Sequence, residues 1–399
     1  MIRHCPVGRI TRLKIIYITD FYYTVSSGAR TSARAHLKTL QNLYGKDNVL
    51  VVALVGKIVP PETEKEHIII RGTCSDAVLL LNCLCGYSTY INRSAVSRIL
   101  NLIKERNVNV IFVDNSIFGL LIKIIKTEYP SIPILSYYHD VKAKLARDWM
   151  KDAPIYKKPV MRAMLSNEKL TAEYADVNFV LGNREEKLFI EAYGKRPEAQ
   201  LSVYMDIQLS NDFYIKIPNS KKKILFLGGY YRPNVHGIEW FIKNVYPQLM
   251  DRVELIIAGR GMEKLNANSY PNGVVVKGYV ESIEGIYRDA DIVISPIFEG
   301  GGMKVKVAEA MAFGKMVIGS NESYEGYQEK IPNDYWNKFF YRANTADEFV
   351  SKIKIAMESD AKKFHFNPEI RKLYEDGFSE KYAEKVISKM IGECVGENK

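Results

Sequence analysis

Ten short runs of consecutive apolar residues are spread along the chain, and most are followed by a helical pattern. A strand that is apolar at consecutive positions is buried on both faces, which is typical of a parallel sheet covered by helices. The runs form two successive series, so the sequence predicts an α/β protein with two doubly wound domains. The predicted strands are Leu13–Thr19, Val49–Val55, Val108–Val113, Pro133–Tyr138 and Val177–Leu181, then Lys223–Gly228, Val253–Ala258, Gly273–Lys277, Asp291–Ser295 and Met316–Gly319.

The two domains are expected to comprise residues 1–216 and 217–399. The segment Ile217–Lys221 is a proline-containing polar break that precedes a fresh strand. An amphipathic helix over 379–390 belongs to neither series, and packing against the N-terminal domain is one option for it. In the first series, Asn183 followed three residues later by Glu186 has the pattern of a capping box.

A triple-glycine turn carries the clearest chemical signal. Gly300, Gly301 and Gly302 follow a predicted strand and precede a predicted helix. Three glycines lose much conformational entropy on folding, and a bare backbone at a helix N-terminus suits an anionic ligand. Lys306 and Glu309 are three residues apart and share one face of the helix. Lys306 could neutralise a diphosphate, and Glu309 could accept hydrogen bonds from ribose hydroxyls.

The second half resembles the nucleotide-binding domain of retaining glycosyltransferase family four, in its triple-glycine subgroup of the bacterial surface-polysaccharide type. The resemblance rests on segments in the family's order: Ile224–Gly229, Pro233–Phe241, Leu255–Gly261, Val276–Val280, Ala290–Pro296 and the block from Gly300 to Glu309. It implies the GT-B fold, two Rossmann-like domains facing a cleft. It also implies a nucleotide-diphosphate-sugar donor, retention at the anomeric carbon, and no metal or other cofactor.

Carried over to this chain, Glu309 matches the second glutamate of the family's Glu-x7-Glu motif, which holds the ribose. Gly301 stands where the first glutamate is usual. Two alternatives follow. Either Glu299, two residues earlier, takes the place of the first glutamate as a catalytic residue, or this carboxylate has no counterpart in the chain. The residues expected to bind the donor are Gly28, Arg232, Tyr279, Gly300, Gly301, Gly302, Met303, Lys304, Lys306 and Glu309.

Three positions of the first half are also candidates. His139 and Asp114 each follow a predicted strand, at the edge where ligands gather in open α/β sheets. The family often has a histidine at the place of His139, near the donor sugar, so His139 is predicted to be catalytic. Gly28 lies in the loop after the first strand, and the alternative for this loop is a plain helix N-terminus.

The charge of the chain is uneven. Residues 1–217 hold 30 Lys and Arg against 21 Asp and Glu, which is +9, and the remainder adds +1. Between Lys142 and Arg162, seven cations alternate with apolar residues, a composition suited to an anionic membrane surface; a solvated loop is the alternative. No run is long enough to span a bilayer. Five cysteines without paired spacing favour free thiols, no metal site and a cytoplasmic protein, peripheral at most at the inner face of the membrane.

The sequence thus predicts an enzyme that transfers a sugar from a nucleotide-diphosphate donor to a saccharide or lipid-linked saccharide. Two alternatives remain open: a non-catalytic sugar-nucleotide sensor or scaffold, and a sugar-nucleotide epimerase of the same fold. No recognised RNA- or DNA-binding module supports a nucleic-acid partner.

Overall fold

The structure is a computed structural model, which describes residues 13–24, 28–56, 66–72, 75–88, 91–143, 150, 154–214, 221–358 and 366–396. The chain divides into two compact units. The first comprises Met1–Leu201 with Ala383–Lys399, and the second comprises Ser202–Tyr382. The boundary predicted between residues 216 and 217 falls outside the described residues and stays a prediction.

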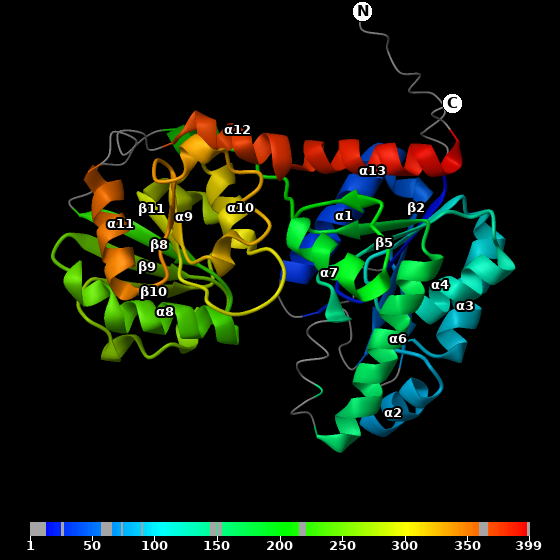
Figure 1. Ribbon diagram of the computed structural model, residues 1–399. Coiled ribbons are helices and arrows are strands. Elements are labelled where there is room, and N and C mark those ends of the chain that lie inside the picture. Colours follow the sequence, from blue (N-terminus) through cyan, green and yellow to red (C-terminus); the bar gives the residue numbers. More distant parts are fainter. Residues whose placement is uncertain are drawn as a thin grey trace, which may run out of the picture. The chain divides into compact units, whose positions relative to one another are not determined.

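The first unit holds a sheet of parallel strands in the order β3-β2-β1-β4-β5-β6-β7. Helices flank both faces of this sheet (Figure 1). Its strands are β1 (Ile15–Thr19), β2 (Val49–Val55), β3 (Ile68–Arg71), β4 (Val110–Val113), β5 (Ile134–Tyr137), β6 (Val177–Val180) and β7 (Ala199–Gln200). Its helices are α1 (Gly28–Tyr44), α2 (Asp76–Leu84), α3 (Arg93–Arg106), α4 (Gly119–Glu128), α6 (Lys158–Tyr174), α7 (Asn183–Tyr193) and most of α13 (Glu380–Val395).

The second unit repeats this plan with the strand order β10-β9-β8-β11-β12-β13, again all parallel. Its strands are β8 (Lys222–Leu227), β9 (Val253–Ala258), β10 (Val274–Gly278), β11 (Ile292–Ser295), β12 (Val317–Gly319) and β13 (Phe340–Arg342). Its helices are α8 (Arg232–Asn244), α9 (Ile283–Asp289), α10 (Val305–Ala312), α11 (Ala346–Glu358) and α12 (Pro368–Gly377).

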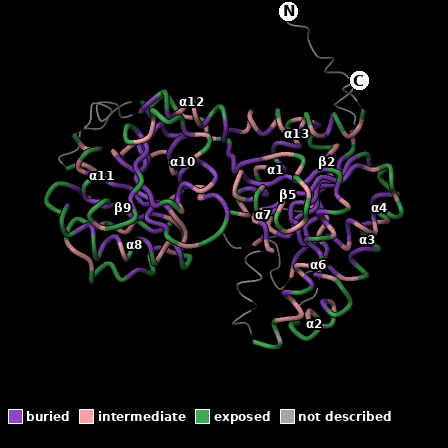
Figure 2. The backbone as a smooth tube through the Cα atoms, viewed as in Figure 1, coloured by how far each residue is buried: buried purple, intermediate pink, exposed green. Residues whose placement is uncertain are grey.

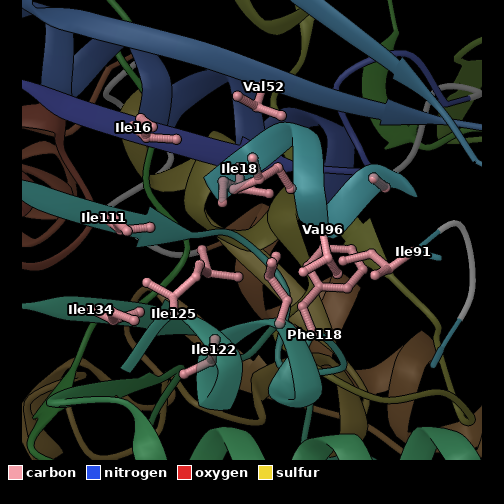
Figure 3. Packing of buried hydrophobic residues seen from close by; sticks show 14 of the residues in the cluster. Ile16, Ile18, Val52, Ile91, Val96, Ile111, Phe118, Ile122, Ile125 and Ile134 are labelled. Atoms are coloured by element: carbon pink, nitrogen blue, oxygen red, sulfur yellow. The ribbon is translucent and has the colours of Figure 1, made fainter. Parts of the chain in front are cut away.

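The central strands are buried along their length in both units, as Figure 2 shows. β1, β4, β5 and β11 are buried at every position. In the first unit, a cluster of isoleucine, valine and phenylalanine side chains joins the sheet to α3 and α4 (Figure 3). Each fully buried side chain of this kind stabilises the fold by about 1.5–3 kcal/mol. The two parallel Rossmann-like sheets predicted from the apolar runs are therefore confirmed.

One local prediction is wrong. Asn183 does not cap α7, because it is already the first helical residue and Gly182 takes the cap position without a side-chain bond. The amide of Gln200 instead donates to Asn183 Oδ1 at 2.7 Å and to Glu186 Oε2 at 2.6 Å. A contact with β7 has replaced the local bond that the spacing suggested.

Candidate functional site

The glycine turn of the second unit connects β11 to α10. Gly300 and Gly302 have φ angles of +115° and +65°, in a region that residues other than glycine rarely adopt. Gly301 is exposed, whereas Met303 is buried beneath Gly326. Met303 can therefore meet a ligand only through its main chain, as the three glycines do. The turn therefore needs glycine for its geometry and brings bare backbone to the start of α10.

Lys304 and Lys306 leave this turn in different directions. The Lys304 ammonium donates to Gly302 O at 2.9 Å and to Glu322 Oε1 at 2.8 Å, so it is already neutralised. The Lys306 ammonium is buried and donates to Asn234 Oδ1 at 2.8 Å. It also lies 4.1 Å from the centroid of the Phe226 ring. Of these two lysines, Lys306 is the one whose ammonium is buried at the carboxyl ends of the strands.

Burial changes the ionisation of both residues of the Lys306–Glu309 pair. It lowers the pKa of Lys306 to about 7, with the charge of Glu309 opposing the shift and that of Lys304 adding to it. It also raises the pKa of Glu309, against the opposing charge of Lys306. Tyr287 donates to Glu309 Oε2 at 3.4 Å. A buried ammonium and a half-buried carboxyl on one face of a helix are a common arrangement at ligand sites.

Glu299 lies on the same loop but faces α8. One oxygen of its carboxylate is 3.7 Å from Arg232 Nε and 3.5 Å from His236 Nδ1. The Arg232 side chain is 86% exposed, so it can move toward a ligand at little cost. Gly300 and Pro233 are also close, with 3.8 Å between an added Cβ and Pro233 Cγ. The first turn of α8 therefore borders the glycine turn.

The remaining strand ends of this unit are joined by main-chain bonds. Gly228 N donates to Ala258 O at 2.9 Å, and Tyr230 N donates to Arg260 O at 2.9 Å. The Arg260 guanidinium lies over the ring of Tyr279, 5.3 Å from its centroid, and Tyr279 is 59% exposed. An exposed aromatic ring backed by a cation is a surface on which a planar base can stack.

The first unit gathers a second cluster at the carboxyl ends of β1, β4 and β5. Asp114 Oδ1 is 2.7 Å from His36 Nδ1 and 3.3 Å from His139 Nε2. Thr19 donates to the other oxygen of Asp114 at 3.2 Å. Asp114 and His36 are fully buried, and His139 is 11% exposed. Asp114 is thus held between one buried histidine and one that reaches the surface.

Electrostatics favours a charged Asp114. Burial alone would raise its pKa, but the charges of His139 and His36, together with their hydrogen bonds, bring the pKa below its ordinary value. Burial lowers the pKa of His36. Burial raises the pKa of the neighbouring Asp20 to about 6, although a hydrogen bond from Asn115 opposes this.

A buried glutamate fixes the chain just after His139. Glu168 accepts from the main-chain N–H groups of Lys142 and Ala143, each at 3.1 Å. It also accepts from Ser116 Oγ at 2.8 Å and from the Tyr193 hydroxyl at 2.5 Å. Four donors fully satisfy this carboxylate, so its role is to hold the loop rather than to bind a ligand.

The structure brings most donor-binding candidates of the second unit to one edge of its sheet. Gly28 lies in the other unit, at the start of α1, and Ser26 and Ser27 of the same loop fall outside the described residues. Asn234, Tyr287, Arg260 and His36 are neighbours that sequence reasoning missed. Asn234 and Arg260 lie inside the segments that resemble the family, and this resemblance could have indicated them as site residues. The contact of His36 with Asp114 joins positions 78 residues apart, and no sequence pattern indicates it.

The basic segment Lys142–Arg162 is only partly described, because 144–149 and 151–153 fall outside the described residues. Lys142 forms an ion pair with Asp140 and is largely buried, so it does not belong to a solvated basic face. Lys157 and Arg162 are exposed. Within the described part of the chain, no group of three or more His, Cys, Asp or Glu residues is arranged to hold a metal ion.

Solved structures identify the architecture as the GT-B fold of glycosyltransferases. Anabaena Alr3699/HepE in complex with UDP is similar over 96% of this chain and 100% of its own, with a TM-score of 0.67 and 14% identity. A glycosyltransferase from Rickettsia africae is similar over 97% and 99% of the two chains, with a TM-score of 0.67 and 16% identity. At sequence identities this low, the structural similarity establishes the fold alone.

Residues 221–359 match the family model described as glycosyl transferases group 1. This segment contains every donor-binding candidate of the second unit. An uncharacterized glycosyltransferase of Methanocaldococcus jannaschii, MJ1069, is 28% identical over 209 residues, which is 49% of each chain. An uncharacterized protein from the cps region of Klebsiella pneumoniae is 26% identical over 28% of this chain and 32% of its own. The matched regions thus span half or less of these relatives, and the comparisons support the group 1 glycosyltransferase family.

Proposed function

We propose that this protein is a retaining glycosyltransferase that moves a sugar from a nucleotide diphosphate to a saccharide or lipid-linked saccharide. The observation that carries the proposal is the buried Lys306 with the half-buried Glu309 behind the glycine turn, inside the segment that matches the family model. A buried ammonium needs an anion, and a carboxyl one helical turn further along can take two ribose hydroxyls.

Each part of the donor has a matching part of the second unit. Lys306, the N-terminus of α10 and the backbone of Gly300–Gly302 would meet the diphosphate, with Arg232 moving in from the solvent. Glu309 would hold the ribose, and Tyr279 would lie against the base. When the bond between the anomeric carbon and the β-phosphate oxygen breaks, negative charge grows on that oxygen. Fixed N–H donors and cations stabilise this charge, and such electrostatic stabilisation is usually a large part of catalysis.

In the first unit, His139 would act at the donor sugar. Its Nε2 lies 3.3 Å from both the main-chain carbonyl oxygen and the carboxylate Oδ1 of Asp114, so Asp114 would keep the ring oriented, in the way that a carboxylate orients a catalytic histidine elsewhere. HepE has been solved with UDP and with UDP-glucose, which supports testing uridine nucleotides first.

We further propose that the acceptor is reached at the inner face of a membrane. The excess of +9 in residues 1–217 and the exposed Lys157 and Arg162 support an anionic surface as the partner. Among the described residues, no helix has both the length and the hydrophobicity to cross a bilayer.

A thermal-shift screen against UDP, GDP, ADP, dTDP and their sugars tests the donor site. A ligand at 100 times its dissociation constant stabilises the folded state by about 2.7 kcal/mol, which gives a clear rise in melting temperature. The Lys306→Met variant is the control, because it should lose most of the shift. If no nucleotide raises the melting temperature of the wild-type protein, the donor-site proposal is wrong.

The second candidate is a non-catalytic sugar-nucleotide sensor. It is favoured by one observation: Gly301 replaces the family's first glutamate, and Glu299 is paired with side chains of α8. Slow hydrolysis of the preferred sugar nucleotide distinguishes the two. An enzyme releases nucleotide diphosphate and free sugar, and His139→Ala abolishes the release. A sensor binds the same nucleotide without releasing either product.

A further inference from the structure

Helix α2 of the first unit has an apolar surface that faces the solvent. Seven of its nine residues are apolar, and Cys83 is the one that is buried. Val78, Leu81 and Leu84 are 47%, 60% and 66% exposed. They are spaced three apart, so they form one stripe along the helix. A helix that is apolar on all sides is normally buried in a protein or in a membrane.

The buried side of α2 is already occupied. α2 packs against α6, and the carbonyl of Gly86, just after α2, accepts from Asn167 Nδ2 of α6 at 2.8 Å. The stripe of Val78, Leu81 and Leu84 points away from these contacts, as its exposure requires. The fold of this unit therefore leaves these three apolar side chains exposed to solvent.

Basic and apolar groups continue this surface at the N-terminal end of α6. The short helix η3 (Ile155–Lys157) leads directly into α6, and Figure 1 shows α2 beside the same end of α6. Ile155 is 84% exposed, the highest value among the described large apolar side chains. Lys157 of η3 and Arg162 in the first turns of α6 are exposed as well. Leucine and isoleucine side chains framed by cations match a lipid surface with anionic headgroups.

We infer that the α2 stripe and Ile155 insert into the headgroup region of an anionic membrane, with Lys157, Lys158 and Arg162 on the lipid phosphates. The inference rests on the proposed use of a membrane-bound acceptor, and it names the part of the chain that enters the lipid. A second copy of the chain fits less well. A stable dimer buries about 800 Å² per partner, whereas a nine-residue helix is only about 13 Å long.

Vesicle sedimentation tests the inference, with phosphatidylcholine alone and with added phosphatidylglycerol. The informative variant is Leu81→Gln with Leu84→Gln, because glutamine is a good helix former and adds no charge that anionic lipid would repel. Ile355→Gln is the matched control: Ile355 is 47% exposed on α11 of the other unit. Lys157→Gln with Lys158→Gln and Arg162→Gln removes these three cations while leaving the stripe intact.

The wild-type protein and the Ile355→Gln control should sediment with anionic vesicles. The double leucine variant should bind them at least tenfold more weakly while keeping the steep salt dependence that the cations provide. The cation variant should instead lose that salt dependence. All variants should keep the wild-type melting temperature and nucleotide affinity, because the stripe contacts no donor-binding candidate.

Three results would overturn the inference. One is equal binding of the double leucine variant and the wild type to anionic vesicles. Another is a wild type that binds neither kind of vesicle at low salt. The third is a wild-type dimer in sedimentation velocity that the leucine substitutions dissociate, which would make the stripe an interface between copies. Nucleotide binding is measured on the same samples, so failure of the donor site is seen separately from failure of the membrane surface.

Discussion

Replacing Lys306 by methionine should make the empty protein more stable and the nucleotide complex weaker. Burial lowers the pKa of Lys306 from 10.5 to about 7. Each pKa unit corresponds to about 1.4 kcal/mol, so burying the Lys306 amine in the folded state near pH 7 costs on the order of 4 kcal/mol. Methionine removes that cost and keeps the apolar stem, but it also removes the bond to Asn234, worth about 1.5–3 kcal/mol. The expected net gain is about 1–3 kcal/mol.

The direction of the pH dependence follows from the same pKa. Between about pH 7 and pH 10.5 the unfolded chain holds a proton on Lys306 more often than the folded chain does. The contribution of Lys306 therefore makes the folded state more stable as the pH rises through this window. In Lys306→Met this contribution is absent, so the advantage of the variant should shrink from neutral to alkaline pH. An anionic ligand favours the protonated amine, so nucleotide affinity of the wild type should fall above pH 7.

Differential scanning calorimetry, with and without the nucleotide found in the screen, measures both effects. For a domain of this size, 1 kcal/mol corresponds to about 2–4 °C in melting temperature. Lys306→Met should melt several degrees higher than the wild type when empty and gain little from nucleotide. Lys304→Met is the contrast: its ammonium is paired with Glu322, so its loss should lower the melting temperature instead. A less stable Lys306→Met with unchanged nucleotide affinity would refute the reasoning.

Other substitutions probe the two clusters separately. Glu309→Gln should weaken nucleotide binding at least tenfold by isothermal titration calorimetry, because it loses charge-assisted bonds of about 1.5–3 kcal/mol each, and unaltered affinity would remove Glu309 from the site. His139→Ala should keep nucleotide affinity and lose most sugar transfer in a product assay. Asp114→Asn should lower the free energy of unfolding, measured with urea, by about 3–5 kcal/mol at pH 7; because the folded pKa of Asp114 is depressed, this difference should begin to shrink only as the pH falls below about 3.8. Gly237→Ala should also melt lower, since its Cβ would lie 2.0 Å from Pro296 O.

The strands that could be predicted from the sequence are those buried on both faces. Val49–Val55 and Val253–Ala258 are observed with the bounds that their apolar runs indicated. β3, β7 and β13 were missed, and they comprise four, two and three residues. All three lie at the edges of their sheets. A strand of this length contains too few positions for a periodic signal and depends on the neighbour with which it pairs.

The same division applies to the site. The shared face of Lys306 and Glu309 follows from the helical repeat, and α10 does include both residues. The partners of this pair could not be found in this way. Asn234 is 72 residues from Lys306, and Tyr287 is 22 residues from Glu309. Asn234 meets Lys306 because parallel strands bring their carboxyl ends to one edge, and Tyr287 meets Glu309 where α9 and α10 contact each other. Neither contact follows from any single window along the chain.

Buried charges in this fold differ in how completely the protein itself satisfies them. Glu168 receives four hydrogen bonds from described residues, two from main-chain N–H groups of the loop after His139 and two from the side chains of Ser116 and Tyr193. Lys306 carries three N–H donors, and among the described residues one of them has an acceptor, Asn234 Oδ1. A carboxylate with four donors needs nothing further, whereas an ammonium in an apolar setting has capacity for phosphate oxygens. The cost of keeping Lys306 buried is therefore explained by the ligand it is proposed to bind, and not by the stability of the fold.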